Sequence, residues 1–268
     1  MTGVKLEKRF CAFLDILGFK EIVKENGDAD EACAKVVDAL KAGLRTLEYP
    51  LSHKLVDVKS FSDNLLFSLK YNIGSKFVVP MFEFVCKYQR TLIQSGYFVR
   101  GGISLGGLYI DDHAIYGEAL VEAYEIESLK AINPVVMLSR DVLEFAKSNE
   151  HMGVVSQVFN GKLCRSYIFE FNGQCFVNYL RSAFVPVEDP DAVGILPTEL
   201  DVEFMRFHRD AVILNLEKYS ENRRVYEKYL FLAAYHNAFC DACAGDSEAN
   251  EELKIKTSGY DFKFLKGF

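Results

Sequence analysis

Hydrophobic and polar positions along the first part of the chain predict a strand followed by two helices. An apolar run over residues 9–14 predicts a buried strand that stops at Asp15. A turn at Gly18 follows, and the pattern then favours a helix over residues 19–26. Apolar residues recur at helical spacing over residues 30–47, so we expect a second, amphipathic helix there.

The next stretch of the pattern predicts a β-hairpin. Residues 55–61 and 65–69 are β-type runs separated by the small polar residues Ser62, Asp63 and Asn64. Such a spacer is typical of a tight turn. We therefore expect Asp63 at the tip of a hairpin.

A helix over residues 76–95 and extended chain over residues 97–104 and 108–110 complete the first half. The order strand, helices, hairpin, helix, strand is the ferredoxin-like plan, an α+β fold with an antiparallel sheet and helices. In that plan loops at one edge of the sheet gather functional groups. We expect Asp15 and Asp63 to meet at that edge.

The second half of the chain predicts further elements of both kinds. They are a helix over 117–130, a strand over 135–138, a helix over 141–147, a hairpin over 163–180 that turns at Asn172-Gly173, and helices over 200–216 and 222–243. Prolines 186, 190 and 197 indicate a linker between the last hairpin and the last two helices. The expected organisation is a core domain over residues 1–185 and a C-terminal α-helical appendage over residues 198–268, packed on the core.

Composition narrows the class of protein. Of 268 residues, 50% are hydrophobic and 26% charged, which favours a folded, globular chain. The net charge of -7 without a Lys- or Arg-rich segment argues against a nucleic-acid partner. No apolar run approaches the roughly 20 residues that cross a bilayer, so we expect neither a membrane partner nor secretion. Seven scattered cysteines, an odd number in mostly apolar runs, favour reduced thiols and a cytoplasmic protein.

The two aspartates are the candidate chemistry. A pair of carboxylates can hold two divalent ions, Mg²⁺ or Mn²⁺, about 3.5 to 4 Å apart, an arrangement suited to phosphoryl transfer. An aspartate at a turn is also favoured simply by its own backbone hydrogen bonding. Asp15 differs from that case because it interrupts an apolar segment just before the Gly18 turn, whose backbone N–H groups form a phosphate cradle ahead of a helix.

Four segments of the sequence resemble the class III adenylate and guanylate cyclases. Residues 13–19 (FLDILGF) are similar to the family's metal-binding opening, and residues 59–63 (KSFSD) to its hairpin with a second metal-binding aspartate. Residues 100–106 (RGGISLG) resemble its central Arg-x-Gly-Ile strand. Residues 116–128, with Tyr116-Gly117, Ala123 and Glu127-Ser128, resemble its aromatic-Gly turn and the helix after it. The resemblance covers about residues 9 to 140 in the family's order.

The resemblance implies a site, a cofactor and an assembly. It implies a class III cyclase catalytic core over residues 1–185 that holds two divalent metal ions (Mn or Mg) and a nucleoside triphosphate. It also implies a head-to-tail homodimer with active sites at the interface. The metal ligands it implies are Asp15, Asp63 and the backbone carbonyl of Ile16, and the main-chain triphosphate-binding residues are Leu17, Gly18 and Phe19.

Departures from the family's pattern bear on the substrate. Val121 and Glu125 stand where the family carries an Asn and an Arg, and Ala114 stands where adenylate cyclases carry a base-reading acid. The sequence is more similar to the pyrimidine cyclases of bacterial Pycsar anti-phage defence. That resemblance implies conversion of UTP, or next CTP, to a 3′,5′-cyclic monophosphate that a separate effector protein reads as an alarm signal.

Two basic residues have two open interpretations each. Lys59 stands where adenylate cyclases carry a base-reading lysine, and we predict that it donates to a pyrimidine carbonyl from the strand face of Asp63; a solvated edge lysine is the alternative. Arg100 is predicted to supply charge to the triphosphate or the transition state; an ion pair with a helix acid is the alternative.

The function has open alternatives as well. They are a cyclase-shaped binding or dimerisation module without turnover, a purine cyclase, and a diguanylate-cyclase-like or polymerase-like transferase on the same structural plan.

Overall fold

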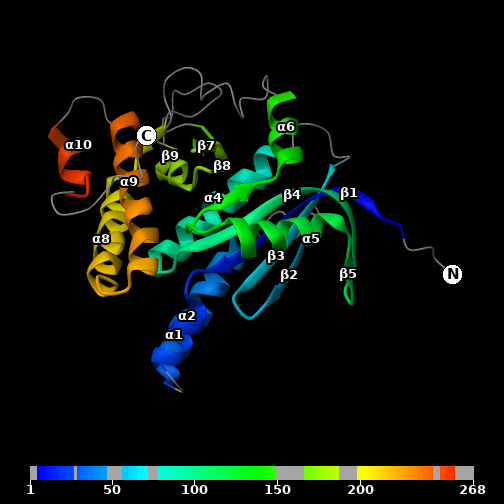
Figure 1. Cartoon of the computed structure of the whole chain (residues 1–268), viewed down its shortest axis with the longest axis horizontal. Coiled ribbons are helices and arrows are strands. Elements are labelled where there is room, and N and C mark those ends of the chain that lie inside the picture. Colours follow the sequence, from blue (N-terminus) through cyan, green and yellow to red (C-terminus); the bar gives the residue numbers. More distant parts are fainter. Residues whose placement is uncertain are drawn as a thin grey trace.

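One large mixed sheet organises the molecule (Figure 1). The computed structural model describes residues 5–26, 29–46, 56–71, 78–148, 166–186, 198–243 and 248–256. Its eight-stranded sheet has the order β2-β3-β1-β4-β6-β8-β7, and β5 pairs with β4. The strands of this sheet are β1 (Glu7–Ile16), β2 (Val56–Phe61), β3 (Asn64–Lys70), β4 (Val99–Ile110), β5 (Ile115–Tyr116), β6 (Val136–Leu138), β7 (Ile168–Phe171) and β8 (Gln174–Val177).

Helices precede and follow the central strands. They are α1 (Phe19–Asn26), α2 (Asp30–Arg45), α4 (Val78–Gln94), α5 (Glu118–Glu125) with the π-helical turn η3 (Ile126–Lys130), α6 (Arg140–Ser148), the 3₁₀ helix η6 (Tyr179–Ala183), α8 (Val202–Lys218), α9 (Arg223–Cys243) and α10 (Glu248–Leu253).

The first four strands have the ferredoxin-like topology that the sequence predicts. Strand β1 lies between β3 and β4 and is antiparallel to both, and β2 completes a β2-β3-β1-β4 sheet. The predicted α+β fold is therefore confirmed. The order arises because α1 and α2 connect β1 to the outer strand of the β2–β3 hairpin, and α4 connects that hairpin to β4 on the other side of β1.

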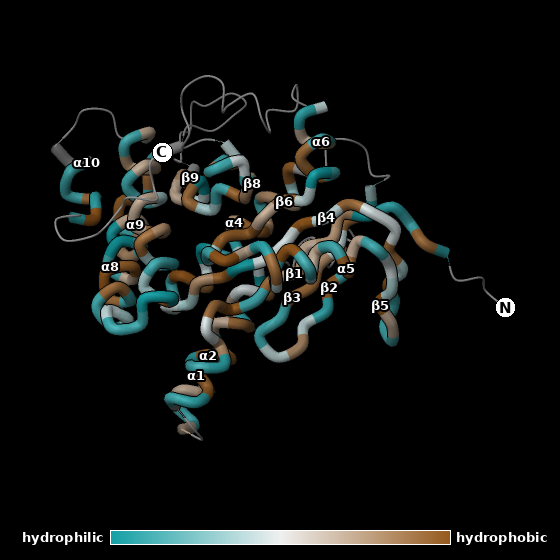
Figure 2. The backbone as a smooth tube through the Cα atoms, in the orientation of Figure 1, coloured by the Kyte–Doolittle hydropathy of each residue, from teal (hydrophilic) through white to brown (hydrophobic). Residues whose placement is uncertain are grey.

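The two faces of β1 pack into different hydrophobic clusters, because successive side chains on a strand point to opposite faces. Phe10, Ala12, Leu14 and Ile16 are buried in the main core with residues of α2 and α4. Cys11 on the other face joins a smaller cluster with residues of α5. Figure 2 shows hydrophobic colour along much of the central strands and alternating hydrophilic and hydrophobic residues along the helices. Asp15 has the same parity as Cys11 and so belongs to the α5 face.

Helix α5 lies close to β4 because that strand presents small residues to it. A Cβ atom on Gly102 would lie 2.5 Å from the carbonyl oxygen of Ala123 and 2.6 Å from Cβ of Ile126. Two residues further along, the Ser104 hydroxyl donates to the carbonyl oxygen of Ala119 at 2.5 Å. The glycine therefore allows the backbone of α5 and η3 to approach the sheet beside Arg100.

Most of the predicted elements of the second half are present. The β7–β8 hairpin turns at Asn172 and Gly173, both with positive φ (50° and 76°), as a two-residue hairpin turn requires. The extended segments predicted over 97–104 and 108–110 form one continuous strand, β4, because β1 pairs with its glycines as well. Some predicted elements extend beyond the described residues, at residues 47, 55, 76–77 and 163–165.

The two ends of the predicted proline linker form short strands in the structure. Strands β9 (Phe184–Pro186) and β10 (Thr198–Leu200) pair with each other in a two-stranded sheet. Strands of three residues are too short to show alternation, which is why the pattern did not indicate them. The interior of the linker lies outside the described residues. Helix α10 lies within the predicted C-terminal appendage but was not among the helices predicted individually.

The C-terminal helices pack onto the rest of the fold. Buried residues of α8 and α9 belong to the same hydrophobic cluster as the sheet and α4. Tyr229 of α9 meets Phe98, just before β4, with ring centroids 5.6 Å apart. Lys218 at the end of α8 donates to Glu25 of α1 at 2.7 Å. No helix in the described parts of the chain is long and apolar enough to cross a membrane.

Candidate active site

The carboxyl end of β1 and the tip of the β2–β3 hairpin bring Asp15 and Asp63 together. Asp15 is the penultimate residue of β1, and Asp63 lies in the two-residue turn between β2 and β3. Its neighbour Ser62 has a positive φ of 58°, which is the backbone conformation of a tight turn. The two carboxyl groups are within hydrogen-bonding reach of each other. The predicted juxtaposition of the two aspartates is present.

The electrostatics of this pair favour a bound cation. Burial, together with the hydrogen bond and the charge of Asp63, raises the pKa of Asp15 to about 7, and Arg100 acts in the opposite direction. Two close carboxylates cannot both ionise without cost, so one of them keeps a proton near neutral pH unless positive charge is supplied. A divalent ion is one such source of charge.

Arg100 connects Asp15 to a third acid, Glu127. In the antiparallel register Arg100 lies directly opposite Asp15, and its Nε donates to Oδ2 of Asp15 at 3.1 Å. Its terminal NH2 group forms an ion pair with Glu127 at 2.6 Å. Glu127 is only 4% exposed, and burial raises its pKa while Arg100 opposes the rise. The ion pair with a helix acid, one of the two interpretations that the sequence left open for Arg100, is therefore present, and the same guanidinium group also contacts Asp15.

The turn after β1 presents backbone amides beside the carboxylates. Gly18 has a φ of 75°, a conformation that favours glycine, and α1 begins at the next residue. The amide of Leu17 already donates to the carbonyl oxygen of Phe98 at 2.8 Å. Within the described residues, no backbone hydrogen bond is donated by the amides of Gly18 and Phe19. Of the three predicted triphosphate-binding residues, these two have amides left for an anion.

The backbone of Ile16 points toward the hairpin. The Leu17–Phe98 hydrogen bond extends the β1–β4 ladder, and backbone groups of successive residues on a strand point to opposite neighbours. The backbone groups of Ile16 consequently point away from β4 and toward the β3 side. On that side the pairing of β1 with β3 has already ended at Leu65. Asp63 follows on that side.

The donors present fit a hard divalent ion. Carboxylate and carbonyl oxygens are the ligands that Mg²⁺ and Mn²⁺ prefer. Asp15 and Asp63 are adjacent. The pKa of Asp15 is raised even though Arg100 acts to lower it, so Arg100 alone does not compensate the negative charge of the pair. No group of three or more His, Cys, Asp or Glu side chains among the described residues is arranged to hold a metal ion. Substrate phosphates and water would complete such a coordination shell.

Lys59 does not join this site in its own chain. It pairs with Leu66 across the β2–β3 hairpin, and its Nζ lies 3.7 Å from Oδ1 of Asp112 in the β4–β5 connection. The expectation that it shares a strand face with Asp63 was wrong, because β2 ends at Phe61 and Asp63 lies in the turn beyond it. A spacing of four residues aligns two side chains only while both are on the strand.

Two residues that interact with the charges of the site were not predicted as site residues. Glu127 was part of a quoted motif, but the π-helical turn that brings it back to Arg100 has no recognised sequence signal. Lys228 of α9 was not predicted from any motif. Burial lowers its pKa, the charge of Arg100 adds to that shift and the charge of Asp15 opposes it. A lysine in a predicted helix carries no signal of what that helix packs against.

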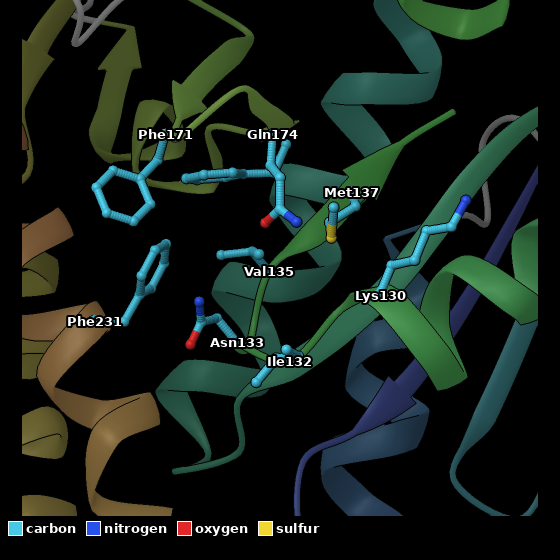
Figure 3. Close-up of a pocket in the computed structure, with 9 residues that line it drawn as sticks. Lys130, Ile132, Asn133, Val135, Met137, Phe171, Gln174 and Phe231 are labelled. Atoms are coloured by element: carbon cyan, nitrogen blue, oxygen red, sulfur yellow. The ribbon is translucent and has the colours of Figure 1, made fainter. Parts of the chain in front are cut away.

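A small pocket lies elsewhere, between the η3–β6 connection, the β7–β8 hairpin and α9 (Figure 3). Its polar lining residues are Lys130, Asn133 and Gln174, beside Met137 and Phe231. It contains no carboxylate, so it is distinct from the aspartate pair.

Comparisons with known proteins match structures but not sequences. No protein-family model matches the chain, and no curated protein matches it either. Among solved structures, the chain is similar to a bacterial light-regulated adenylyl cyclase with a TM-score of 0.41 and 16% identity, over 54% of this chain and 47% of that one. The chain thus spans about half the length of that protein.

Two further similar structures are matched over nearly their whole length. The monomeric guanylyl cyclase domain of the RhoGC fusion protein from the aquatic fungus Blastocladiella emersonii has a TM-score of 0.42 and 16% identity, over 65% of this chain and 96% of that one. The adenylyl cyclase CyaB from P. aeruginosa has a TM-score of 0.38 and 14% identity, over 71% and 98%. Similarity at this level does not assign an activity to the chain.

Proposed function

We propose that this chain is a nucleotidyl cyclase that converts a nucleoside triphosphate to its 3′,5′-cyclic monophosphate and pyrophosphate. The observation that carries the proposal is the meeting of Asp15, Asp63 and Arg100 at one edge of a ferredoxin-like sheet, beside the Gly18 turn. A carboxylate pair, a cation and a helix start with amides facing an anion are what phosphoryl chemistry needs. The motif resemblance of residues 9–140 to class III cyclases supports the same reaction.

The residues of the candidate site have separate roles in the proposed reaction. The ribose 3′-hydroxyl oxygen attacks the α-phosphorus, the bond from that phosphorus to the bridging oxygen breaks, pyrophosphate leaves with the electron pair, and the hydroxyl proton passes to solvent. Asp15, Asp63 and the Ile16 carbonyl would hold two divalent ions, Mn²⁺ or Mg²⁺, which when bound neutralise phosphate charge and acidify the hydroxyl. The amides of Gly18 and Phe19 bind phosphate oxygens, and Arg100 stabilises negative charge that develops at the α-phosphate.

We propose a pyrimidine substrate, UTP before CTP. Val121 is 55% exposed on α5 and Glu125 is exposed as well, so this face offers neither the amide nor the guanidinium that purine cyclases carry at the matching positions. Ala114 likewise lacks a base-reading acid. By resemblance to the Pycsar cyclases, we propose that the product is a cytoplasmic signal in antiviral defence that a separate effector protein reads.

We also propose that the active form is a homodimer. Exposed apolar side chains occur at the end of β2, on β5, on α5, on η3 and just after η3; they are Phe61, Tyr116, Val121, Tyr124, Leu129 and Ile132. A surface of this kind favours a protein partner. Because Lys59 pairs with Asp112 in its own chain, its proposed contact with the base would be made in the partner's site.

A substrate panel tests this function. Purified protein is incubated with Mn²⁺ and each of ATP, GTP, CTP and UTP, and products of wild type and Asp63→Ala are identified by mass spectrometry. Cyclic UMP, or cyclic CMP, from wild type alone supports the proposal. Cyclic AMP or cyclic GMP alone would return the chain to the purine cyclases, a linear or cyclic dinucleotide would indicate a transferase, and binding without turnover would indicate a non-catalytic module.

A further inference from the structure

Arg100 is shared between a candidate metal ligand and a buried acid. Its Nε lies 3.1 Å from Oδ2 of Asp15, and its terminal NH2 lies 2.6 Å from Oε1 of Glu127. The side chain of Asp15 is 16% exposed, whereas that of Glu127 is 5% exposed. The charge of one guanidinium group is therefore divided between two carboxylates, and the proposed function needs one of these for a divalent ion.

The π-helical turn η3 holds Glu127 against the sheet. The turn follows α5 directly, and the Ala131 amide donates to the carbonyl oxygen of Ile126 at 2.8 Å. A Cβ atom on Gly102 of β4 would lie 2.6 Å from Cβ of Ile126, so η3 and β4 are in close contact beside Glu127. Such turns are rare and occur frequently at functional sites. A carboxylate buried in this way is costly without a counter-charge, which Arg100 supplies.

Glu127 supplies charge to Arg100 and is not a further metal ligand. Within the part of the chain that the structure describes, no three His, Cys, Asp or Glu side chains are arranged to hold a metal ion. The contact with Arg100 is an ion pair and not a well-aligned hydrogen bond, because Oε1 of Glu127 has no hydrogen-bond partner among the described residues. Its effect on the site is therefore exerted through the guanidinium group.

The charges explain what this ion pair does for the two aspartates. Without Glu127, the guanidinium group would compensate Asp15 alone, and a divalent ion would have to displace it from that carboxylate. With Glu127, one acid compensates Arg100, and Asp15 and Asp63 keep two negative charges between them. Two carboxylate charges are suited to a hard divalent ion.

We propose that Glu127 is a positioning residue for the metal site: it retains Arg100 by charge and so leaves Asp15 free for a divalent ion, while the guanidinium group stays in the site for the triphosphate. This inference rests on the proposed function for the role of the ion. The ligand that it concerns is a hard divalent cation. It gives a role to a buried acid to which the proposed reaction assigns none.

The test is a double-mutant cycle on Mn²⁺ binding without nucleotide, followed by the loss of the free-ion signal in electron paramagnetic resonance. Glu127→Gln should weaken binding about tenfold, because Arg100 then competes with the ion for Asp15. In the Arg100→Gln background the competitor is absent, so the same Glu127→Gln change should alter binding less than about twofold. A direct effect of the Glu127 charge on the ion would appear in both backgrounds instead.

Glu125→Gln is the matched control, because it removes an exposed carboxylate from the end of α5, two residues before Glu127. It should bind Mn²⁺ within about twofold of wild type, as expected for a solvent-screened charge. Thermal unfolding midpoints establish that each variant is folded. Glu127→Ala takes the place of Glu127→Gln in the cycle if the latter is unfolded.

The inference is overturned if Glu127→Gln binds Mn²⁺ as wild type does, if it loses the same factor in both backgrounds, if Glu125→Gln loses as much, or if wild type binds none. The proposed function can fail separately. An Arg100-dependent effect of Glu127→Gln without cyclic product from wild type would overturn only the cyclase. Cyclic product from wild type, with an effect that does not depend on Arg100, would overturn only this inference.

Discussion

Arg100 contacts two acids at once, Asp15 and Glu127, and a guanidinium group is suited to this because it has donors on several nitrogen atoms. A lysine has one nitrogen and cannot reproduce both contacts. We predict that Arg100→Lys lowers kcat about tenfold or more with a smaller change in KM. Arg140→Lys is the control, since Arg140 is an exposed residue paired with Glu144. Equal steady-state kinetics for Arg100→Lys and wild type would remove Arg100 from the mechanism.

The carboxylate pair predicts a stability response to metal ions. Mn²⁺ at about a hundredfold excess over its dissociation constant should raise the thermal unfolding midpoint of wild type by roughly 5–10 °C, because a ligand that binds only the folded state stabilises it. Asp63→Asn should lose this increase. Asp38→Asn, which changes an exposed carboxylate on α2, should keep it. An undiminished increase in Asp63→Asn would place the ion elsewhere.

At the residue scale, the sequence identified the residues that have a local signal. Asp15 interrupts an apolar run before a glycine, and Asp63 stands in a short polar turn, so both were predictable from their neighbours. Glu127 was not, because it reaches the site through packing between distant segments. Lys59 shows the opposite error: it belongs to a recognisable motif, but its position relative to Asp63 depends on where β2 ends.

Among the elements, the α5–η3 segment determines the position of Glu127. Its close contact with β4 requires Gly102, where a Cβ atom would lie 2.5 Å from the backbone of α5. We predict that Gly102→Ala lowers the free energy of unfolding by about 2 kcal/mol through overpacking, and lowers kcat by moving Glu127 from Arg100. Gly107→Ala on the same strand is the control, since its Cβ would have 3.6 Å of space. Urea unfolding that ranks Gly107→Ala as the less stable variant would contradict this account.

The helices α8 and α9 meet at a buried histidine pair. The Nδ1 atoms of His208 and His236 lie 3.0 Å apart, and their Nε2 atoms contact Tyr179 and the Leu253 carbonyl. Burial lowers the pKa of His208 well below its usual value and that of His236 to about 4. Because the unfolded chain takes up protons first, stability is complete above about pH 6.5 and is lost as the pH falls toward 4.

We therefore predict that the free energy of unfolding falls by about 2 kcal/mol between pH 7 and pH 5 through His236, apart from other groups. Urea unfolding at both values measures the fall. His236→Gln should be less stable than wild type at pH 7 but show a smaller fall, and the exposed His113→Gln should fall like wild type. The same fall in His236→Gln and wild type would exclude the pair as its source.

Elements were predicted better where they are long. The helices α2, α4, α8 and α9 extend over many residues, β1 follows from its apolar run, and the two hairpins follow from the residues of their turns. The strands β5, β9 and β10 have two or three residues each, and no period can be read over such a length. Their pairing depends on which distant segment lies beside them.

For the whole molecule, a dimer with shared sites predicts complementation. A protomer with Asp63→Ala and a protomer with Lys59→Ala should each be inactive as homodimers, because every site lacks one group. Their equal mixture should recover about a quarter of wild-type activity, since half of randomly paired dimers are mixed and one of their two sites is intact. No recovery after subunit exchange, with Lys59→Ala inactive alone, would place Lys59 in the site of its own chain.

The central claim is that Asp15 and Asp63 support an intramolecular cyclisation. The most direct measurement follows UTP labelled in its α-phosphate, with Mn²⁺, in wild type, Asp15→Asn and Asp63→Asn, counting labelled cyclic nucleotide and released pyrophosphate. The account predicts one pyrophosphate for each labelled cyclic UMP in wild type and less than about a hundredth of that rate in either variant. No cyclic nucleotide from wild type with any of the four triphosphates, or undiminished product in both variants, would contradict it.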